Sequence, residues 1–128
     1  MGMNNSRNFD LLTLGQVLLR LSPPDNERLS RGDTFVKQVG GAELNVAVGA
    51  ALLGLHTGVI SKLPAHDIGS FMKGKIRSFG VSDDFFMYDQ SSSARVGIYY
   101  YENGAYPRKP KVIYDRNNSS FFSLDINE

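Results

Sequence analysis

The sequence of 128 residues contains no cysteine. A disulfide framework, a zinc–thiolate site and a cysteine nucleophile are therefore all excluded. No apolar run approaches the roughly 18 residues of a membrane span, and the polar N-terminal stretch lacks the apolar segment of a secretory signal. We expect a cytoplasmic protein with no membrane partner.

An excess of charge of one sign is also missing. Fourteen Lys and Arg residues face thirteen Asp and Glu residues, for a net charge of +1. No basic field is available for non-specific nucleic-acid binding, so we expect no nucleic-acid partner. The hydrophobic content of 41% and the length fit one folded globular domain.

The commonest short catalytic motifs are absent as well. The sequence has no P-loop, no dinucleotide-binding glycine motif, no nucleophile elbow and no zinc-protease motif. His56 lies in a predicted turn and His66 lies beside a predicted helix start. Such histidines are more often solvated or capping residues than metal ligands, so we assign no metal.

The predicted elements follow the order of an α/β protein. The run Leu11–Leu14 stops at Gly15 and resumes over Val17–Leu21, which predicts one buried strand that ends near Ser22. Further β-prone segments are 34–39, 59–60, 84–89, 96–102 and 111–116, of which the last two form a predicted hairpin.

Two helices are predicted between these strands. Residues 43–53 are apolar nearly all round, which predicts a helix that is buried on most sides. Residues 67–79 are amphipathic, with Asp67 as a candidate cap and Gly80 at the end. This order predicts a parallel sheet with flanking helices and an additional antiparallel β flap.

The most informative segment is Gly40-Gly41-Ala42-Glu43-Leu44-Asn45 at the start of the first helix. Two glycines there let a ligand approach the backbone, and the free N–H groups of the first turn can bind its oxygens. The same residues also suit a simple turn followed by a polar first-turn residue. From the residues alone, both interpretations remain open.

Several separated motifs resemble the N-terminal part of ribokinase-like (PfkB-type) carbohydrate kinases, over about residues 9–123. They are Gly15, Gly-Gly-Ala-Glu-Leu-Asn-Val-Ala (40–47), Leu-Gly-Leu (53–55), Asp-Ile-Gly (67–69) and Gly80-Val81. Within that family, the sequence is most similar to the 2-dehydro-3-deoxygluconokinase branch. That similarity rests on residues 20–24, 40–45, 96–99 and 112–116.

The resemblance implies a sugar acid bound between the parallel sheet and a β lid. Gly41 and Asn45 would touch its hydroxyls, Tyr99 and Tyr114 would line the pocket from the lid, and Arg116 would bind the carboxylate. A planar guanidinium suits a carboxylate in two-point geometry. The alternative for the tyrosines is a role as aromatic residues on a sheet surface or a dimer interface.

The resemblance also implies how the chain is divided. Strands near Leu11–Leu14 and Val59–Ile60 would belong to the main sheet, and segments of about 17–39 and 96–116 would form the lid. A lid with tyrosines on alternating faces must cover one face with substrate or its own core and the other with a partner. We therefore expect a homodimer through the lid.

Two departures from the family pattern bear on activity. Gln16 stands where the family usually has an acidic residue. Family members are also more than twice this length, and the Gly-Ala-Gly-Asp anion hole, the catalytic aspartate and the ATP pocket are missing here. Residues 1–128 are thus predicted to be an inactive N-terminal fragment with no catalytic residue, whereas the full-length relative uses ATP and Mg²⁺.

Two other functions remain open. The chain could be a non-catalytic sugar-binding or dimerisation module, in which nothing is phosphorylated. It could also derive from a ribokinase- or fructokinase-type kinase that acts on another sugar.

Overall fold

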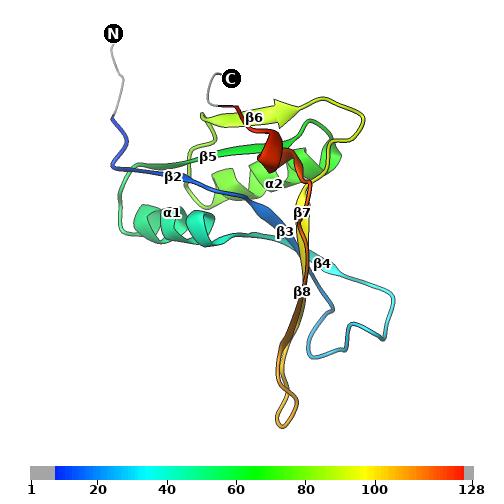
Figure 1. Ribbon diagram of the computed structural model, residues 1–128. Coiled ribbons are helices and arrows are strands. Elements are labelled where there is room, and N and C mark those ends of the chain that lie inside the picture. The colour runs from blue at the N-terminus through cyan, green and yellow to red at the C-terminus, as the bar shows by residue number, and fades with distance from the viewer. Residues whose placement is uncertain (1–7, 126–128) are drawn as a thin grey trace.

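A computed structural model describes residues 8–125, whose strands form two separate sheets (Figure 1). The main sheet has the order β2 (Leu11–Leu14), β5 (Thr57–Pro64) and β6 (Phe86–Asp89). The second sheet, which we call the lid sheet, has the order β4 (Val36–Gly40), β3 (Leu18–Ser22), β7 (Gly97–Glu102) and β8 (Lys111–Asp115). The helices are α1 (Ala42–Leu52), α2 (Asp67–Ser78) and a short 3₁₀ helix, η1 (Ser120–Ser123).

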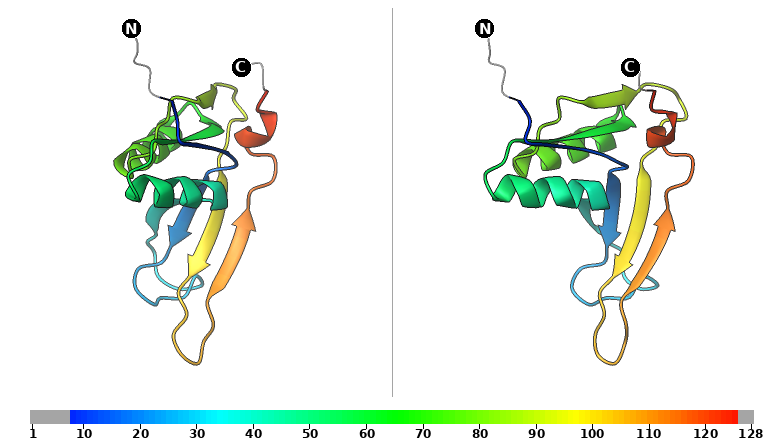
Figure 2. Two further views of the ribbon diagram at one scale, coloured as in Figure 1. Left: turned by 90° about the vertical axis from the view of Figure 1, so that its left-hand side faces the viewer. Right: turned by 60° about the vertical axis from the view of Figure 1, so that its left-hand side comes forward.

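The pairing of the strands confirms the predicted fold class. All pairs in the main sheet are parallel. In the lid sheet, the β3–β4 and β7–β8 pairs are antiparallel, as predicted for the flap. The prediction of a wholly antiparallel flap is wrong, because β3 pairs with β7 in parallel. The lid sheet extends away from the main sheet and ends in the β7–β8 hairpin (Figure 2).

The hydrophobic core lies between the main sheet and the two longer helices. Leu44 and Ala47 of α1 and Met72 and Ile76 of α2 pack there. Val17 and Leu19 join the same cluster, so the base of the lid sheet is anchored in the core. Because α1 starts directly after β4, its N-terminus lies at the junction of the two sheets (Figure 2).

The apolar pattern predicts a single strand across Gly15, and this prediction is wrong, because the segment forms two strands, β2 and β3. The Gly15 N–H donates to the carbonyl of Ile60 at 3.3 Å, after which the chain leaves the main sheet and enters the lid sheet as β3. A Cβ atom at Gly15 would collide with the carboxyl group of Glu43. The glycine marks the crossing between the two sheets, where a larger residue would require the Glu43 side chain on α1 to move aside.

The two helices also differ in detail from the predictions made from the sequence. Only Leu44 and Ala47 of α1 are buried, whereas Val46 is 57% and Leu52 is 79% exposed. The prediction that α1 is buried on most sides is therefore wrong, because nothing within residues 8–125 covers its outer face. For α2, the cap is His66 and not Asp67, since the His66 Nδ1 accepts a hydrogen bond from Ile68 N at 3.3 Å.

The packing of α2 gives a matched pair of glycine substitutions. Alanine normally stabilises an exposed helix position by up to about 1 kcal/mol relative to glycine. A Cβ atom at Gly69 would overlap the carbonyl oxygen of Pro64, whereas a Cβ at Gly74 meets nothing within 4 Å. We expect Gly69→Ala to lower the free energy of unfolding by about 1–3 kcal/mol and Gly74→Ala to raise it slightly. Urea denaturation measures both, and equal effects of the two substitutions would contradict this packing.

Candidate functional site

A pocket of about 300 Å³ lies between the N-terminus of α1 and the lid sheet. Its lining brings together all five residues that the sequence analysis selected, Gly41, Asn45, Tyr99, Tyr114 and Arg116. Leu18 and Ala42, which were not selected, complete the lining. Two separate parts of the chain, α1 and the lid strands, thus supply opposite walls of one pocket.

The wall at α1 depends on the backbone of Gly41. This residue has a φ of 131° and a ψ of 141°, which L-residues with a side chain rarely adopt. A Cβ atom there would lie 2.7 Å from the carbonyl oxygen of Gln16. No side chain caps α1, so the N–H groups of its first turn are available to oxygens of a ligand.

The wall at the lid sheet carries two neighbouring tyrosines. Tyr99 and Tyr114 are paired in register across β7 and β8, with ring centroids 6.0 Å apart. Burial raises the pKa of the Tyr99 hydroxyl, so that this group stays protonated at neutral pH. It is therefore able to donate a hydrogen bond as well as accept one.

Arg116 supplies a positive charge beside these rings. Its guanidinium carbon lies 4.6 Å from the centroid of the Tyr114 ring, a cation–π contact that fixes the side chain. None of the ion pairs found among the described residues includes Arg116, and the neighbouring Asp115 pairs instead with Arg95 at 3.0 Å. The charge of Arg116 is thus available to an anion in the pocket.

Gln16 is not part of the lining but connects the two walls of the pocket, because its backbone lies against Gly41 and its side chain reaches Arg116. Its Nε2 donates to the carbonyl of Arg116 at 3.3 Å and to the Oγ of Ser119 at 2.5 Å. A carboxylate has no donor, and its negative charge would face the partial negative charge of the Arg116 carbonyl oxygen. Sequence reasoning missed this role, although the uncharged residue after Gly15 was a signal that this position differs from the family pattern.

A buried ion pair stabilises the far part of the lid sheet. Glu102 is buried, contacts Arg108 at 2.8 Å and accepts a hydrogen bond from Leu29 N at 2.8 Å. The Leu29 N–H, and then the charge of Arg108, lower the pKa of the Glu102 carboxyl. This pair ties the loop after β3 to the β7–β8 hairpin. No sequence pattern indicates this pair, because Arg108 follows a Pro107 turn and resembles a solvated loop residue.

Residues 8–125 contain neither a clustered metal site nor a membrane-spanning helix. They contain no group of three or more His, Asp or Glu side chains placed to hold a metal ion. No helix in this range is long and apolar enough to cross a bilayer.

A parallel main sheet flanked by helices, a projecting β lid and a pocket between α1 and the lid are the features of the N-terminal part of a ribokinase-like fold. The chain belongs to the pfkB family of carbohydrate kinases, because the family profile matches residues 8–126.

Similar proteins agree with this assignment. The chain is 39% identical over 111 residues to a 2-dehydro-3-deoxygalactonokinase from Haloferax volcanii, covering 87% of this chain and 34% of that protein. It is 32% identical over 124 residues to a 5-dehydro-2-deoxygluconokinase from Bacillus cereus, covering 96% and 37%. The crystal structure of a 2-dehydro-3-deoxygluconokinase from Thermotoga maritima superimposes with a TM-score of 0.84 at 40% identity, covering 90% and 34%. The chain thus spans about a third of the length of these relatives.

The role of Gln16 leads to a test in which a negative charge is introduced at this position. Gln16→Glu removes both donated hydrogen bonds and places a carboxylate against the Arg116 carbonyl, so we expect the free energy of unfolding to fall by about 1–2 kcal/mol. Gln38→Glu, an exposed position on β4, is the matched control and should change stability little. Equal stability of the two variants in urea denaturation would show that Gln16 does not hold the pocket walls together.

Proposed function

We propose that this chain provides the sugar-binding part of a cytoplasmic kinase that phosphorylates a sugar acid, with 2-dehydro-3-deoxygluconate as the favoured substrate. The proposal rests mainly on the position of Arg116. This residue lines the pocket, its guanidinium lies over the Tyr114 ring, and it has no carboxylate partner among the described residues. A guanidinium without an ion-pair partner favours a ligand with a carboxylate over a neutral sugar, because two parallel N–H···O bonds can form between them.

The rest of the lining suits the remainder of such a ligand. The Asn45 amide can both donate to and accept from sugar hydroxyls, and Gly41 lets the ligand approach the backbone. Tyr99 and Tyr114 offer hydroxyls above a largely apolar ring surface. The pocket volume of about 300 Å³ falls at the lower end of the range for small-molecule sites, which suits a six-carbon acid.

The names of the similar proteins support an acid that also carries a keto group. They designate kinases of 2-dehydro-3-deoxygluconate, 2-dehydro-3-deoxygalactonate and 5-dehydro-2-deoxygluconate. All three substrates are aldonic acids with one carbonyl and one missing hydroxyl. The gluconate and galactonate forms differ in hydroxyl configuration, so 2-dehydro-3-deoxygalactonate is the second candidate.

In this proposal, these 128 residues alone do not catalyse phosphoryl transfer. That reaction depends on electrostatic stabilisation of the transferring group and on an aligned nucleophile. A sugar kinase from Pyrococcus horikoshii with this fold, 23% identical, has been crystallised with ATP. In our proposal, this chain positions the sugar. ATP and Mg²⁺ bind to the part of a full-length kinase that corresponds to the remaining two thirds of the relatives.

Calorimetry with 2-dehydro-3-deoxygluconate tests the binding part of the proposal. With one pocket wall open to solvent, we expect a Kd on the order of millimolar, or about 4 kcal/mol. Arg116→Ala should weaken binding at least tenfold, because the carboxylate loses its charged partner. Arg77→Ala, an exposed arginine on α2, is the matched control. Tight binding of ribose that survives Arg116→Ala would contradict the sugar-acid assignment, and turnover of ATP by the 128-residue chain would contradict its inactivity.

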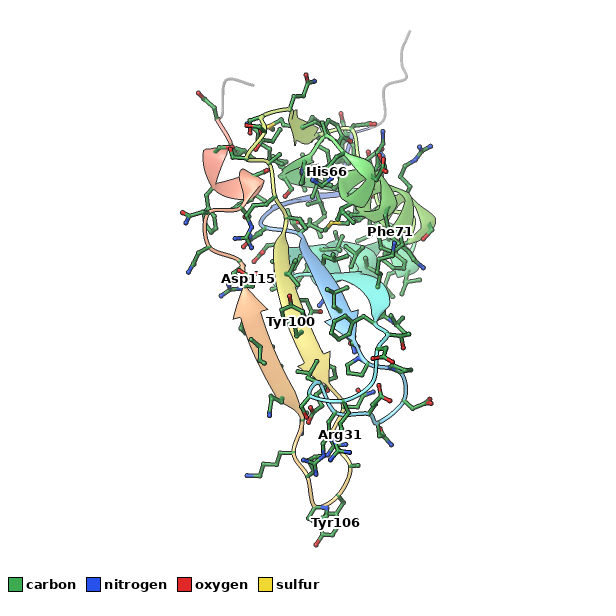
Figure 3. The ribbon with its side chains drawn as sticks, turned by 90° about the vertical axis from the view of Figure 1, so that its right-hand side faces the viewer. Arg31, His66, Phe71, Tyr100, Tyr106 and Asp115 are labelled. Atoms are coloured by element: carbon green, nitrogen blue, oxygen red, sulfur yellow. The ribbon has the colours of Figure 1, made fainter. Side chains whose placement is uncertain are left out.

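The lid sheet carries a second proposal, that of a homodimer. Tyr100 and Ile113 are paired in register on the sheet face opposite to Tyr99 and Tyr114, and the Phe35 ring lies 5.9 Å from that of Tyr100. Figure 3 shows Tyr100 in β7 and Tyr106 at the tip of the hairpin. Phe35 and Ile113 are 47% and 49% exposed, which is unusual for a cluster of large apolar side chains without a partner.

Sedimentation at tens of micromolar tests this dimer, since stable interfaces associate in that range. We expect the unmodified chain to be a dimer and Ile113→Lys to be a monomer, because a charge would enter the apolar contact. Val112→Lys changes the neighbouring position on the other face and should leave the dimer intact. A monomeric unmodified chain would rule out the dimer.

A further inference from the structure

We propose that Arg95 is a positioning residue that holds Arg116 in place for the carboxylate of a bound sugar acid. Arg95 lies outside the lining of the pocket, and it acts on the backbone on either side of Arg116. The inference rests on the proposed function and adds to it, because it identifies what fixes the direction of the carboxylate-binding side chain.

Arg116 needs such support because it lies beyond the end of the lid sheet. The last pair of the β7–β8 ladder is Ile98 with Asp115, so Arg116 follows the last paired residue of β8. The chain turns shortly afterwards at Asn118, whose φ of 59° lies in the left-handed region. The direction of the Arg116 side chain therefore depends on the groups that hold the backbone of residues 115–117.

Arg95 supplies two of these contacts with the two ends of its guanidinium. Its Nη1 donates to the carbonyl of Asn117 at 2.9 Å, and its Nη2 donates to the carbonyl of Asp115 at 2.9 Å. The carbonyl of Arg116, which lies between them in the chain, accepts from Gln16 at 3.3 Å. Side chains thus hold three successive carbonyls, and the planar fork of one arginine holds the outer two at a fixed spacing.

The backbone of Arg95 is itself anchored to the main sheet. The N–H of Arg95 donates to the Oγ of Ser120 at 3.1 Å, and the N–H of Ser120 donates to the carbonyl of Arg95 at 2.8 Å. Ser120 is buried, and its Oγ donates at 2.7 Å to the carboxylate of Asp89, the last residue of β6. A chain of hydrogen bonds therefore runs from the main sheet to the residues on either side of Arg116.

The carbonyl contacts of Arg95 can be separated from its ion pair. The Nη2 of Arg95 also lies 3.0 Å from the carboxylate of Asp115, but the two side chains are 36% and 55% exposed. Water and salt screen such a pair, so it contributes little to holding the segment. Asp115→Asn removes the ion pair and keeps both carbonyl acceptors, which makes it the matched control for Arg95→Gln.

Relaxation of the backbone ¹⁵N nuclei, measured without any ligand, tests the contact first. In the unmodified chain and in Asp115→Asn, we expect order parameters of about 0.85 at Arg116 and Asn117, the level of a rigid backbone. Arg95→Gln lacks the guanidinium fork and should lower them toward about 0.6, while the amides of α2 keep their values and report an intact fold.

Unchanged order parameters at residues 116 and 117 in Arg95→Gln would overturn the proposal. An equal loss of order in Asp115→Asn would overturn it too, because the ion pair would then be what holds the segment. If Arg95→Gln does not fold, Arg95→Lys carries the same test, since it keeps the charge and the aliphatic stem but has no planar fork.

Binding of 2-dehydro-3-deoxygluconate then tests the positioning role in a double-mutant cycle. Arg95→Gln should weaken binding roughly three- to tenfold when Arg116 is present, and should have no further effect in the Arg116→Ala background. Equal weakening in both backgrounds would overturn the proposal, because Arg95 would then act through its charge or through the fold. If the unmodified chain binds no sugar acid, the proposed function fails, and the relaxation measurement still decides whether Arg95 holds Arg116.

Discussion

The close approach of Gly41 to the backbone of Gln16 is the constraint on which the pocket depends. The carbonyl of Gln16 leaves no room for a side chain on Gly41, so α1 can begin directly against the segment that joins the two sheets. The side chain of Gln16 reaches the other way, to Arg116 and Ser119 after β8. One residue of the connection thus sets the distance between the helix wall and the lid wall of the pocket.

The same junction explains why the lid sheet can project from the main sheet and still be ordered. Its base is fixed in the core by Val17 and Leu19, and its far part is fixed by the buried contact of Glu102 with Arg108 and Leu29. The pocket lies between these two anchors on the face that carries Tyr99 and Tyr114. Apolar side chains elsewhere, such as Leu14 and Leu52, are 58% and 79% exposed. These side chains form an apolar surface around the main sheet. The chain spans about a third of the length of its relatives.

Local patterns were sufficient to predict the elements whose residues carry their own signal. The amphipathic period of α2 and the β-rich segments on either side of Gly104 and Pro107 are examples, and the structure has both the helix and the β7–β8 hairpin. The apolar pattern could not predict the break at Gly15, because the residues on both sides continue one pattern while belonging to two sheets. Only the family resemblance, which assigned 11–14 to the main sheet and about 17–39 to the lid, implied it. The outer face of α1 was misjudged for a related reason, since apolar composition does not say which partner is present.

The five pocket residues were selected through the family resemblance, because pattern alone left Gly41 and the tyrosines with two interpretations each. The structure brings all five together. The contribution of Gln16 was missed because it depends on a partner far along the chain, Ser119. Hydrogen bonds of this kind leave no periodic trace in a sequence.

The most direct test of the central claim is an NMR titration of backbone amides with 2-dehydro-3-deoxygluconate and, separately, with ribose. The account predicts saturable shifts for the acid at Gly41, Asn45, Tyr99, Tyr114 and Arg116, and no comparable shifts for ribose. Shifts that appear instead around Gln38 and Lys75, which line a second hollow between β4 and α2, would contradict it. Equal responses to the acid and the neutral sugar would contradict it as well.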